Sequence, residues 1–199
     1  MKIFKENSYD IVRLYVNQLG IMIFSMLLYT AVGSLSNEKL SNALSVCVSV
    51  FSICFYLVLI YYVMWEIGAK DKIRIDGGRM EPCKQKGFVM GLIANIPNLV
   101  LGLLTVIFLA IYLVSKSDGI YSAFLIANTI TRPHAAAYLG VIAAIVPGNT
   151  VGESIDFTEF LIESILFVVL PLISTLVTHL AYYLGSNEKR ILNFNRSRK

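Results

Sequence analysis

Polar side chains inside otherwise apolar segments are the residues of this chain that could do chemistry. Five of them are predicted to lie at similar depth, toward one end of their helices: Asn17, Gln18, Asn95, Asn98 and His179. A polar group in hydrocarbon costs free energy unless it is partnered, so these residues are candidates for a substrate pocket. The plainer interpretation, which we favour from the sequence alone, is a set of hydrogen bonds between helices that only fixes the bundle.

Arg132 is the other exceptional residue, because it interrupts an apolar segment of the chain. A buried arginine needs a carboxylate, backbone carbonyls or water. We expect Glu163 to be its partner, with Glu159 as the second choice. Asp156, Glu159 and Glu163 share one helical face by their i, i+3, i+7 spacing. A structural Arg–Glu pair is the favoured interpretation; solvated charges at a helix start, and a cation or proton site, are the alternatives.

Catalytic and metal-binding patterns are not evident in the sequence. It contains no His-Glu-x-x-His, no Gly-x-Ser-x-Gly and no paired intramembrane aspartates. His134 and His179 are predicted to lie toward opposite faces of a membrane, which argues against one shared metal. The three cysteines fit no disulfide framework. We therefore expect a protein that is not an enzyme and that needs no cofactor or metal.

The elements that position these residues are long apolar segments. Hydrophobic residues make up 56% of the 199 residues and charged residues 15%, and the mean hydropathy is +0.68. Four segments are free of charge and exceed the roughly 20 residues that a membrane-spanning helix needs: 14–37, 40–65, 87–115 and 164–187. A fifth apolar segment, 119–147, is broken in the middle by Arg132-Pro133-His134.

The distribution of basic residues predicts the topology. Of the 17 lysines and arginines, 14 lie in the first 13 residues, between residues 70 and 86, or in the tail from residue 189. The positive-inside rule then places the N-terminus, a loop at 66–86 and the tail 188–199 in the cytoplasm. With both termini on one side, segment 119–147 has to begin and end on the outer side.

The predicted fold is an all-α, polytopic transmembrane helical bundle that forms a single membrane domain. We expect four full spans at about 14–37, 40–65, 87–115 and 160–185. Segment 119–147 is predicted to form a re-entrant helical hairpin that turns near Arg132-Pro133-His134, because proline breaks a helix and each half is too short to span comfortably. A single kinked span, giving five in total, and two short spans, giving six, are the alternatives.

Two local predictions concern the loops and the helix contacts. Ile73 and Ile75 alternate with charged residues, which favours a short strand or a lipid-facing hairpin in the 66–86 loop, followed by a turn at Asp76-Gly77-Gly78.

Small residues recur every three or four positions from Gly87 to Gly102, and every four from Ala136 to Gly148. We expect these stripes to pack helices inside the bundle, with homo-oligomer formation as the alternative.

The function expected from these features is that of a small transport component or permease-like subunit. It would act with a partner subunit or an ATPase. The alternatives are a membrane assembly, immunity or sensor-type protein that docks a partner through its cytoplasmic loop, and a membrane-embedded enzyme. The chain resembles small multi-pass proteins of bacterial cytoplasmic membranes in general style, although no motif assigns a family. We expect contact with the lipid bilayer and none with nucleic acid.

Overall fold

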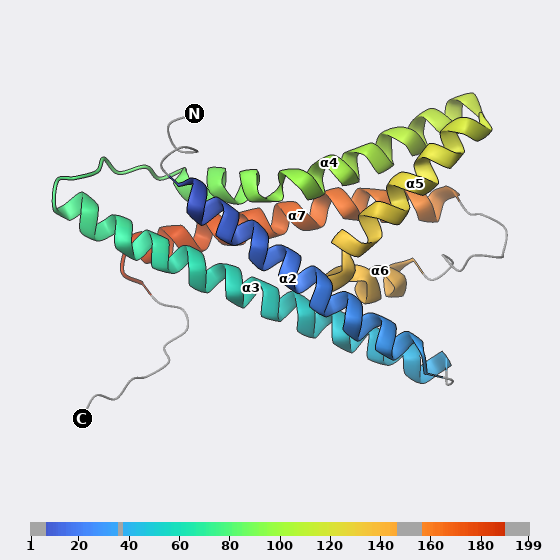
Figure 1. The fold of residues 1–199 in the computed structure, drawn as a ribbon, viewed down its shortest axis with the longest axis horizontal. Helices are drawn as coiled ribbons and strands as arrows, with labels where there is room; N and C mark the ends of the chain where they lie inside the picture. The colour runs from blue at the N-terminus through green and yellow to red at the C-terminus, as the bar shows by residue number, and fades with distance from the viewer. Residues whose placement is uncertain (1–6, 36–37, 147–156, 190–199) are drawn as a thin grey trace.

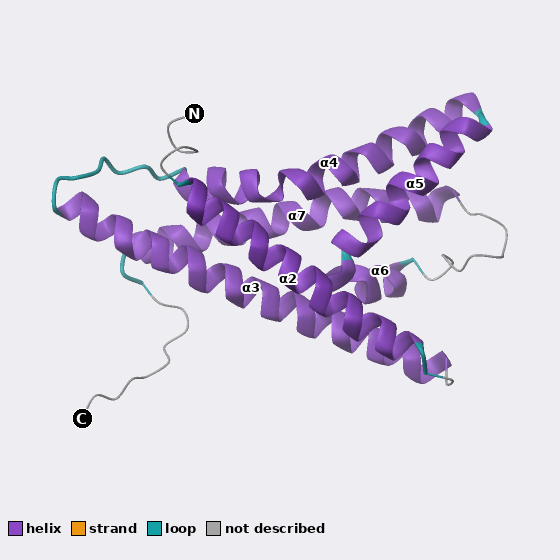
Figure 2. Ribbon diagram, in the orientation of Figure 1, coloured by secondary structure: helices purple, strands orange, loops and turns teal. Residues whose placement is uncertain are grey.

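The computed structural model describes residues 7–35, 38–146 and 157–189, and these form helices joined by short connections (Figures 1 and 2). Four helices are long and apolar enough to cross a membrane, and two shorter helices follow the third of them. The four long helices are α2 (Ser8–Gly33), α3 (Glu38–Asp76), α4 (Lys86–Ser115) and α7 (Phe157–Ser186). The shorter ones are α5 (Asp118–His134) and α6 (Leu139–Ile145), joined by the 3-10 turn η1 (Ala136–Tyr138). The predicted all-α bundle is confirmed.

The four long helices converge at one end of the molecule and separate into two arms at the other (Figure 1). At the converging end, α2 begins, α3 ends, α4 begins and α7 ends; we call it the Asp71 end, after a buried residue of α3. At the opposite end, α4 with α7 forms one arm and α2 with α3 the other. We call this the Glu163 end, after a buried residue near the start of α7.

The short helices form the predicted hairpin. Helix α5 starts at the Glu163 end and runs back along α4 toward the middle of the bundle, and α6 then heads out toward the same end (Figure 1). Both η1 and α6 pack against α3, so the hairpin lies between the two arms. The turn follows directly after Arg132-Pro133-His134, because Pro133 is accommodated in the last turn of α5 and the helix ends at His134. The two halves are also unequal, with 17 residues in α5 and 7 in α6.

The region expected to be a cytoplasmic loop is mostly helix, which corrects the prediction for residues 66–86. Helix α3 continues without a break to Asp76, so Ile73 and Ile75 are helical and form no strand. The alternation of apolar and charged residues was a misleading signal, because Ile67 and Asp71 continue the buried face of α3 at helical spacing. The predicted turn is present: Gly78 has a positive φ of 69°, and the Arg79 amide donates to the Arg74 carbonyl at 2.9 Å.

Small residues bring the helices into close contact, as expected. On α4, Gly87 and Gly91 lie against Tyr182 and Thr178 of α7, and Gly102 lies against the Phe167 carbonyl. Gly140 of α6 lies against the Ser45 backbone of α3. Its amide also donates to the Ser49 hydroxyl at 2.7 Å, so one bond between hairpin and α3 satisfies both groups. Gly148, the last member of the predicted stripe, lies outside the described residues.

Replacing Gly140 with alanine tests the contact between the hairpin and α3. A Cβ atom at this position would overlap the Ser45 backbone, which cannot move as a side-chain tip can. We expect Gly140→Ala to lower stability by about 1–3 kcal/mol, seen as a lower midpoint of thermal unfolding in detergent. The control is Gly20→Ala, because nothing lies within 4 Å of a Cβ there and alanine favours helix. Equal midpoints for the two variants would contradict the close contact.

Candidate functional site

The buried face of α7 carries polar side chains in two groups, which the buried Phe167 and Pro171 separate. Glu163 and Ser164 lie near the start of the helix, and the second half carries Ser174, Thr175, Thr178 and Tyr182. The opposite face is apolar and exposed, with Leu172, Ile173, Leu176 and Leu180. This is the arrangement expected where lipid surrounds the outside of a bundle, and it places hydrogen-bonding groups along the inner surface of α7.

Asn95 of α4 is the centre of the polar contacts. Its side-chain oxygen accepts from Gln18 Nε2 at 3.0 Å and from Ser174 Oγ at 3.3 Å. Its side-chain nitrogen donates to the Gly91 carbonyl at 2.9 Å and to Thr175 Oγ1 at 3.2 Å. Asn95 is 2% exposed, so four contacts satisfy a fully buried amide. We call Gln18, Asn95, Ser174 and Thr175 the Asn95 cluster; it joins α2, α4 and α7.

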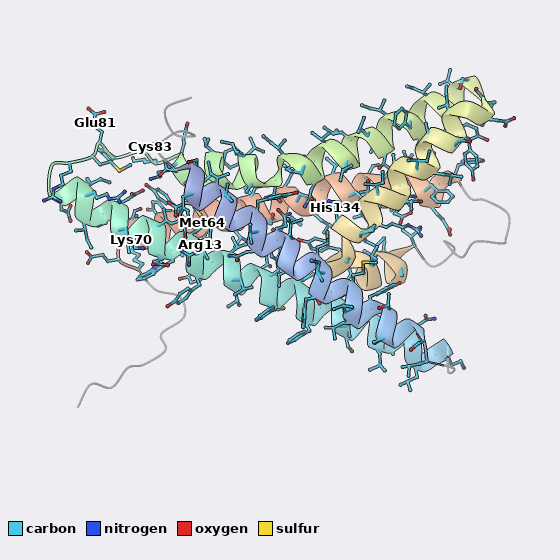
Figure 3. All side chains as sticks on the ribbon, in the orientation of Figure 1. Arg13, Met64, Lys70, Glu81, Cys83 and His134 are labelled. Atoms are coloured by element: carbon cyan, nitrogen blue, oxygen red, sulfur yellow. The ribbon has the colours of Figure 1, made fainter. Side chains whose placement is uncertain are left out.

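A small cavity lies next to the Asn95 cluster, at the turn of the hairpin. It measures about 20 Å³, room for about one water molecule. The lining comes from α4, α5, η1 and α7: Asn98, Thr131, His134, Ala135, Tyr138, Phe167, Leu170 and Pro171. Figure 3 shows His134 near the middle of the molecule, where the hairpin turns. The cavity therefore brings the break in α5 beside two helices that contain prolines, Pro97 in α4 and Pro171 in α7.

His134 presents a hydrogen-bond acceptor in this cavity wall. Its Nδ1 lies 3.0 Å from the Ile130 carbonyl. A carbonyl only accepts, so Nδ1 carries the proton and Nε2 of a neutral ring is left as an acceptor. Tyr56 of α3 lies between the cavity and the Asn95 cluster, because its hydroxyl is close to Ser174 and to Tyr138.

Only part of the predicted pocket is brought together. Gln18 and Asn95 are bonded directly, and Asn98 lines the cavity one turn further along α4. Asn17 is partly buried on α2 and makes none of these contacts. His179 lies apart from the cluster: its ring packs edge-on against Phe88, with the centroids 6.3 Å apart. Its buried Nδ1 has no hydrogen-bond partner among the described residues.

Arg132 and Glu163 form the predicted pair at the opposite end of the polar face. Arg132 Nε donates to Glu163 Oε1 at 3.0 Å, and a terminal guanidinium nitrogen donates to Oε2 at 3.2 Å. The contact is bidentate, the geometry in which arginine binds carboxylates most specifically. The Glu163 side chain is 3% exposed and that of Arg132 36%, so the buried charge is the carboxylate. Glu159 lies one turn earlier and is partly exposed, and Asp156 lies outside the described residues.

Unpartnered polar atoms and a hydroxyl pair lie near this ion pair in the sequence. Thr131 Oγ1 and Thr105 Oγ1 are 3.1 Å apart between α5 and α4. The side-chain oxygens of Asn128 and Ser164 are buried and have no hydrogen-bond partner among the residues that the structure describes. Asn128 precedes Arg132 by one helical turn, and Ser164 follows Glu163. The α5 and α7 faces near the ion pair therefore carry buried polar atoms besides those of the pair itself.

A second buried ion pair, which the sequence reasoning missed, lies at the Asp71 end. Lys86 Nζ donates to Asp71 Oδ2 at 2.6 Å, and the Tyr182 hydroxyl donates to the same oxygen at 3.0 Å. Arg74 approaches the other oxygen at 3.7 Å. Both side chains of the Asp71–Lys86 pair are 2–3% exposed. We call Asp71, Lys86 and Tyr182 the Asp71 cluster; it joins α3, α4 and α7.

The sequence carries a signal for the Asp71 cluster, although it lies in the stretch for which a loop is predicted. Ile60, Met64, Ile67 and Asp71 follow one another at intervals of four, three and four residues, and all are buried. Extending the helix beyond Trp65 would have placed a carboxylate on this apolar face. Gly68 reinforces the placement, because it lets α3 approach the Tyr182 backbone. The other ion pairs of this end are exposed or half-exposed: Glu66 with Arg13 and Lys70, and Lys72 with Asp76. Arg13 and Lys70 are labelled there in Figure 3.

The described residues contain no group of three or more histidine, cysteine, aspartate or glutamate side chains suited to a metal ion. The site consists instead of neutral hydrogen-bonding groups in the middle and one ion-pair cluster at each end. Such an arrangement can hold polar molecules or waters between helices by hydrogen bonds. It can also keep the helices together at both ends by charge pairing.

The Arg132–Glu163 contact can be measured with a double-mutant cycle. Arg132→Ala and Glu163→Ala each remove one partner of a bidentate bond, so each is expected to lower the thermal midpoint of the purified protein. The double variant is expected to lose less than the sum of the two, with a coupling energy of about 0.5–3 kcal/mol. Simple additivity would show that the two side chains do not stabilise each other in solution.

Comparison with known proteins yields no relative from which a role could be taken. No protein-family model, curated protein or solved structure matches the chain. The helices are those of a multi-pass membrane protein, and the function has to be inferred from the contacts described above.

Proposed function

We propose that this protein is a small, permease-like membrane transport component, in which the buried face of α7 lines a path for a polar solute. The observation that carries the proposal is that α7 buries six polar side chains between Glu163 and Tyr182, in two groups near the two ends of the helix. Four long helices could be held together with far fewer polar groups. Each hydrogen bond between membrane helices contributes only about 0.6 kcal/mol on average, so stability alone is a weak reason for so many.

The hairpin supports the same proposal. Backbone that does not span the membrane is tolerated at this depth only where protein surrounds it or where it lines a wet cavity. Here the turn of α5 lines the small cavity together with Asn98 and Pro171. Pro97 and Pro171 each remove one backbone donor from their helix, which leaves a carbonyl free on α4 and another on α7. Many secondary transporters bind their substrates at such helix breaks near the middle of the membrane.

The polar groups in the middle of the path indicate which class of solute it would accept. The Asn95 cluster and the cavity lining contribute amides, hydroxyls and the His134 ring, whereas both ion pairs lie toward the ends. Neutral donors and acceptors bind a small, uncharged, hydrogen-bonding solute without the desolvation cost of an ion. In this proposal the Asp71 end faces the cytoplasm of a bacterial cell, in line with the basic residues near that end.

A partner subunit completes the proposal, because one end of the bundle presents a surface on which such a subunit could dock. The exposed continuation of α3 beyond Trp65 offers Lys70, Lys72 and Asp76 on a rigid helix, a better docking surface than a loop. The same observation supports the second candidate, a membrane assembly or sensor-type protein that docks a partner but transports nothing. Catalysis is not part of either proposal.

Thiol labelling tests whether the path is wet. In a chain with Cys47, Cys54 and Cys83 replaced by serine, Asn98→Cys is expected to react with a water-soluble maleimide in open membranes. Ile96→Cys is the matched control: Ile96 is 48% exposed on the outside of the same helix, and a thiol in lipid stays protonated and unreactive. If the thiols at positions 98 and 96 both fail to react, the centre of the bundle is packed without water.

Reconstitution separates the transport candidate from the assembly candidate. The protein is purified in mild detergent from its native host, and whatever subunits co-purify in fixed ratio are placed with it in liposomes, supplied with ATP if an ATPase is among them. We expect faster entry of urea or glycerol, followed by light scattering, than in empty liposomes. Asn95→Leu removes the central amide and is expected to abolish the gain, while Ile96→Leu retains it. A fixed-ratio partner without any solute entry would support the assembly candidate instead.

A further inference from the structure

Two buried ion-pair clusters stand at opposite ends of the polar face of α7. Glu163 and Tyr182 are separated by 19 residues of one helix, or about 28 Å at the helical rise. This is close to the roughly 30 Å thickness of the hydrocarbon layer. Everything polar on the buried face of α7 between these residues, the Asn95 cluster included, lies between the two charge pairs.

Stability does not explain why charges are buried at these positions. Taking two charges out of water has a large desolvation cost, and replacing a buried ion pair by apolar residues of similar size is often neutral or stabilising. Both partners of the Asp71–Lys86 pair are 2–3% exposed. The best-attested use of such pairs is to specify one arrangement of helices or to switch between two. An ion pair is well suited to this use, because its partners are solvated separately when the helices part.

Each cluster joins the elements that have to separate if the path is to open at that end. Asp71, Lys86 and Tyr182 come from α3, α4 and α7, which converge at the Asp71 end. Arg132, in the last turn of α5, and Glu163 join the turn of the hairpin to α7 on the other side of the cavity. Both clusters are closed in this structure, and the cavity between them has room for about one water.

Building on the proposed function, we propose that the Asp71 cluster and the Arg132–Glu163 pair are the two gates of the path. The structure is then the state with both gates closed. The Arg132 side chain is 36% exposed, whereas Lys86 is 3% exposed. Less protein therefore has to move away from Arg132 than from Lys86, so the Glu163 gate opens more easily than the Asp71 gate.

The test follows how fast a thiol at position 98 reacts from each side. The Asn98→Cys chain without the native cysteines is placed in sealed membrane vesicles of both orientations and treated with a membrane-impermeant methanethiosulfonate. Cys83, kept as the only cysteine in a separate chain, reports which vesicles expose the Asp71 end, because it lies in the connection between α3 and α4 (Figure 3).

The gate variants are Asp71→Asn and Glu163→Gln. Asp71→Asn is expected to raise the rate at position 98 about tenfold from the Asp71 side only, and Glu163→Gln from the opposite side only, as expected for the loss of a charge-assisted bond. The matched control is Asp76→Asn, which removes an exposed pair with Lys72 on the same helix and should leave the rate unchanged. Exchanging the charges, with Asp71→Lys and Lys86→Asp together, should restore the slow rate.

Folding and function are kept separate in this design. Gel filtration shows which variants are folded. If Asp71→Asn does not fold, Tyr182→Phe replaces it as the gate variant, because it removes one bond to Asp71 and keeps the charges paired. Rates that rise equally from both sides, or stay unchanged in folded variants, would overturn the gates while leaving the path in place. A thiol at position 98 that never reacts, in any variant or from either side, would overturn the path itself and the gates with it.

Discussion

The organisation of this molecule depends on the requirement that polar groups in a membrane find their partners within the protein. Helix α7 carries more such groups on one face than any other described helix, and every other long helix contributes partners to that face. Asn95 reaches it from α4 and Asp71 from α3, while Gln18 of α2 is joined to it through its bond to Asn95. The hairpin meets the same requirement at the other end, where Arg132 binds Glu163. The helix arrangement is therefore explained better by the partners that α7 needs than by apolar packing alone.

The coarse architecture could be predicted from the sequence because membrane solvation leaves few alternatives. Long segments without charge are predicted to be spans, and the distribution of basic residues predicts that segment 119–147 returns to the side from which it enters. Arg132 and Glu163 could be paired in advance because an arginine in that segment needs a carboxylate and few were available. The turns were predictable where glycine requires them, as at Gly78 with its positive φ.

The parts that could not be predicted depend on rotation about a helix axis and on where a helix ends. His179 is next to Thr178 in sequence, yet Thr178 faces Gly91 of α4 while the His179 ring packs on Phe88. Depth in the membrane can be read from hydropathy, whereas this angular position is set by packing. The Asp71 cluster was missed for the second reason, because charges beyond Trp65 indicate the end of the membrane but not the end of the helix. Once α3 is extended to Asp76, the position of Asp71 follows from its spacing to Ile67 and Met64.

The order in which the paired residues leave the ribosome has a consequence for biogenesis. Arg132 is made 31 residues before Glu163, a delay of a few seconds at ordinary rates of synthesis. During that time the hairpin contains a guanidinium without its carboxylate. The bond that joins the hairpin to α7 can therefore form only after α7 has been made.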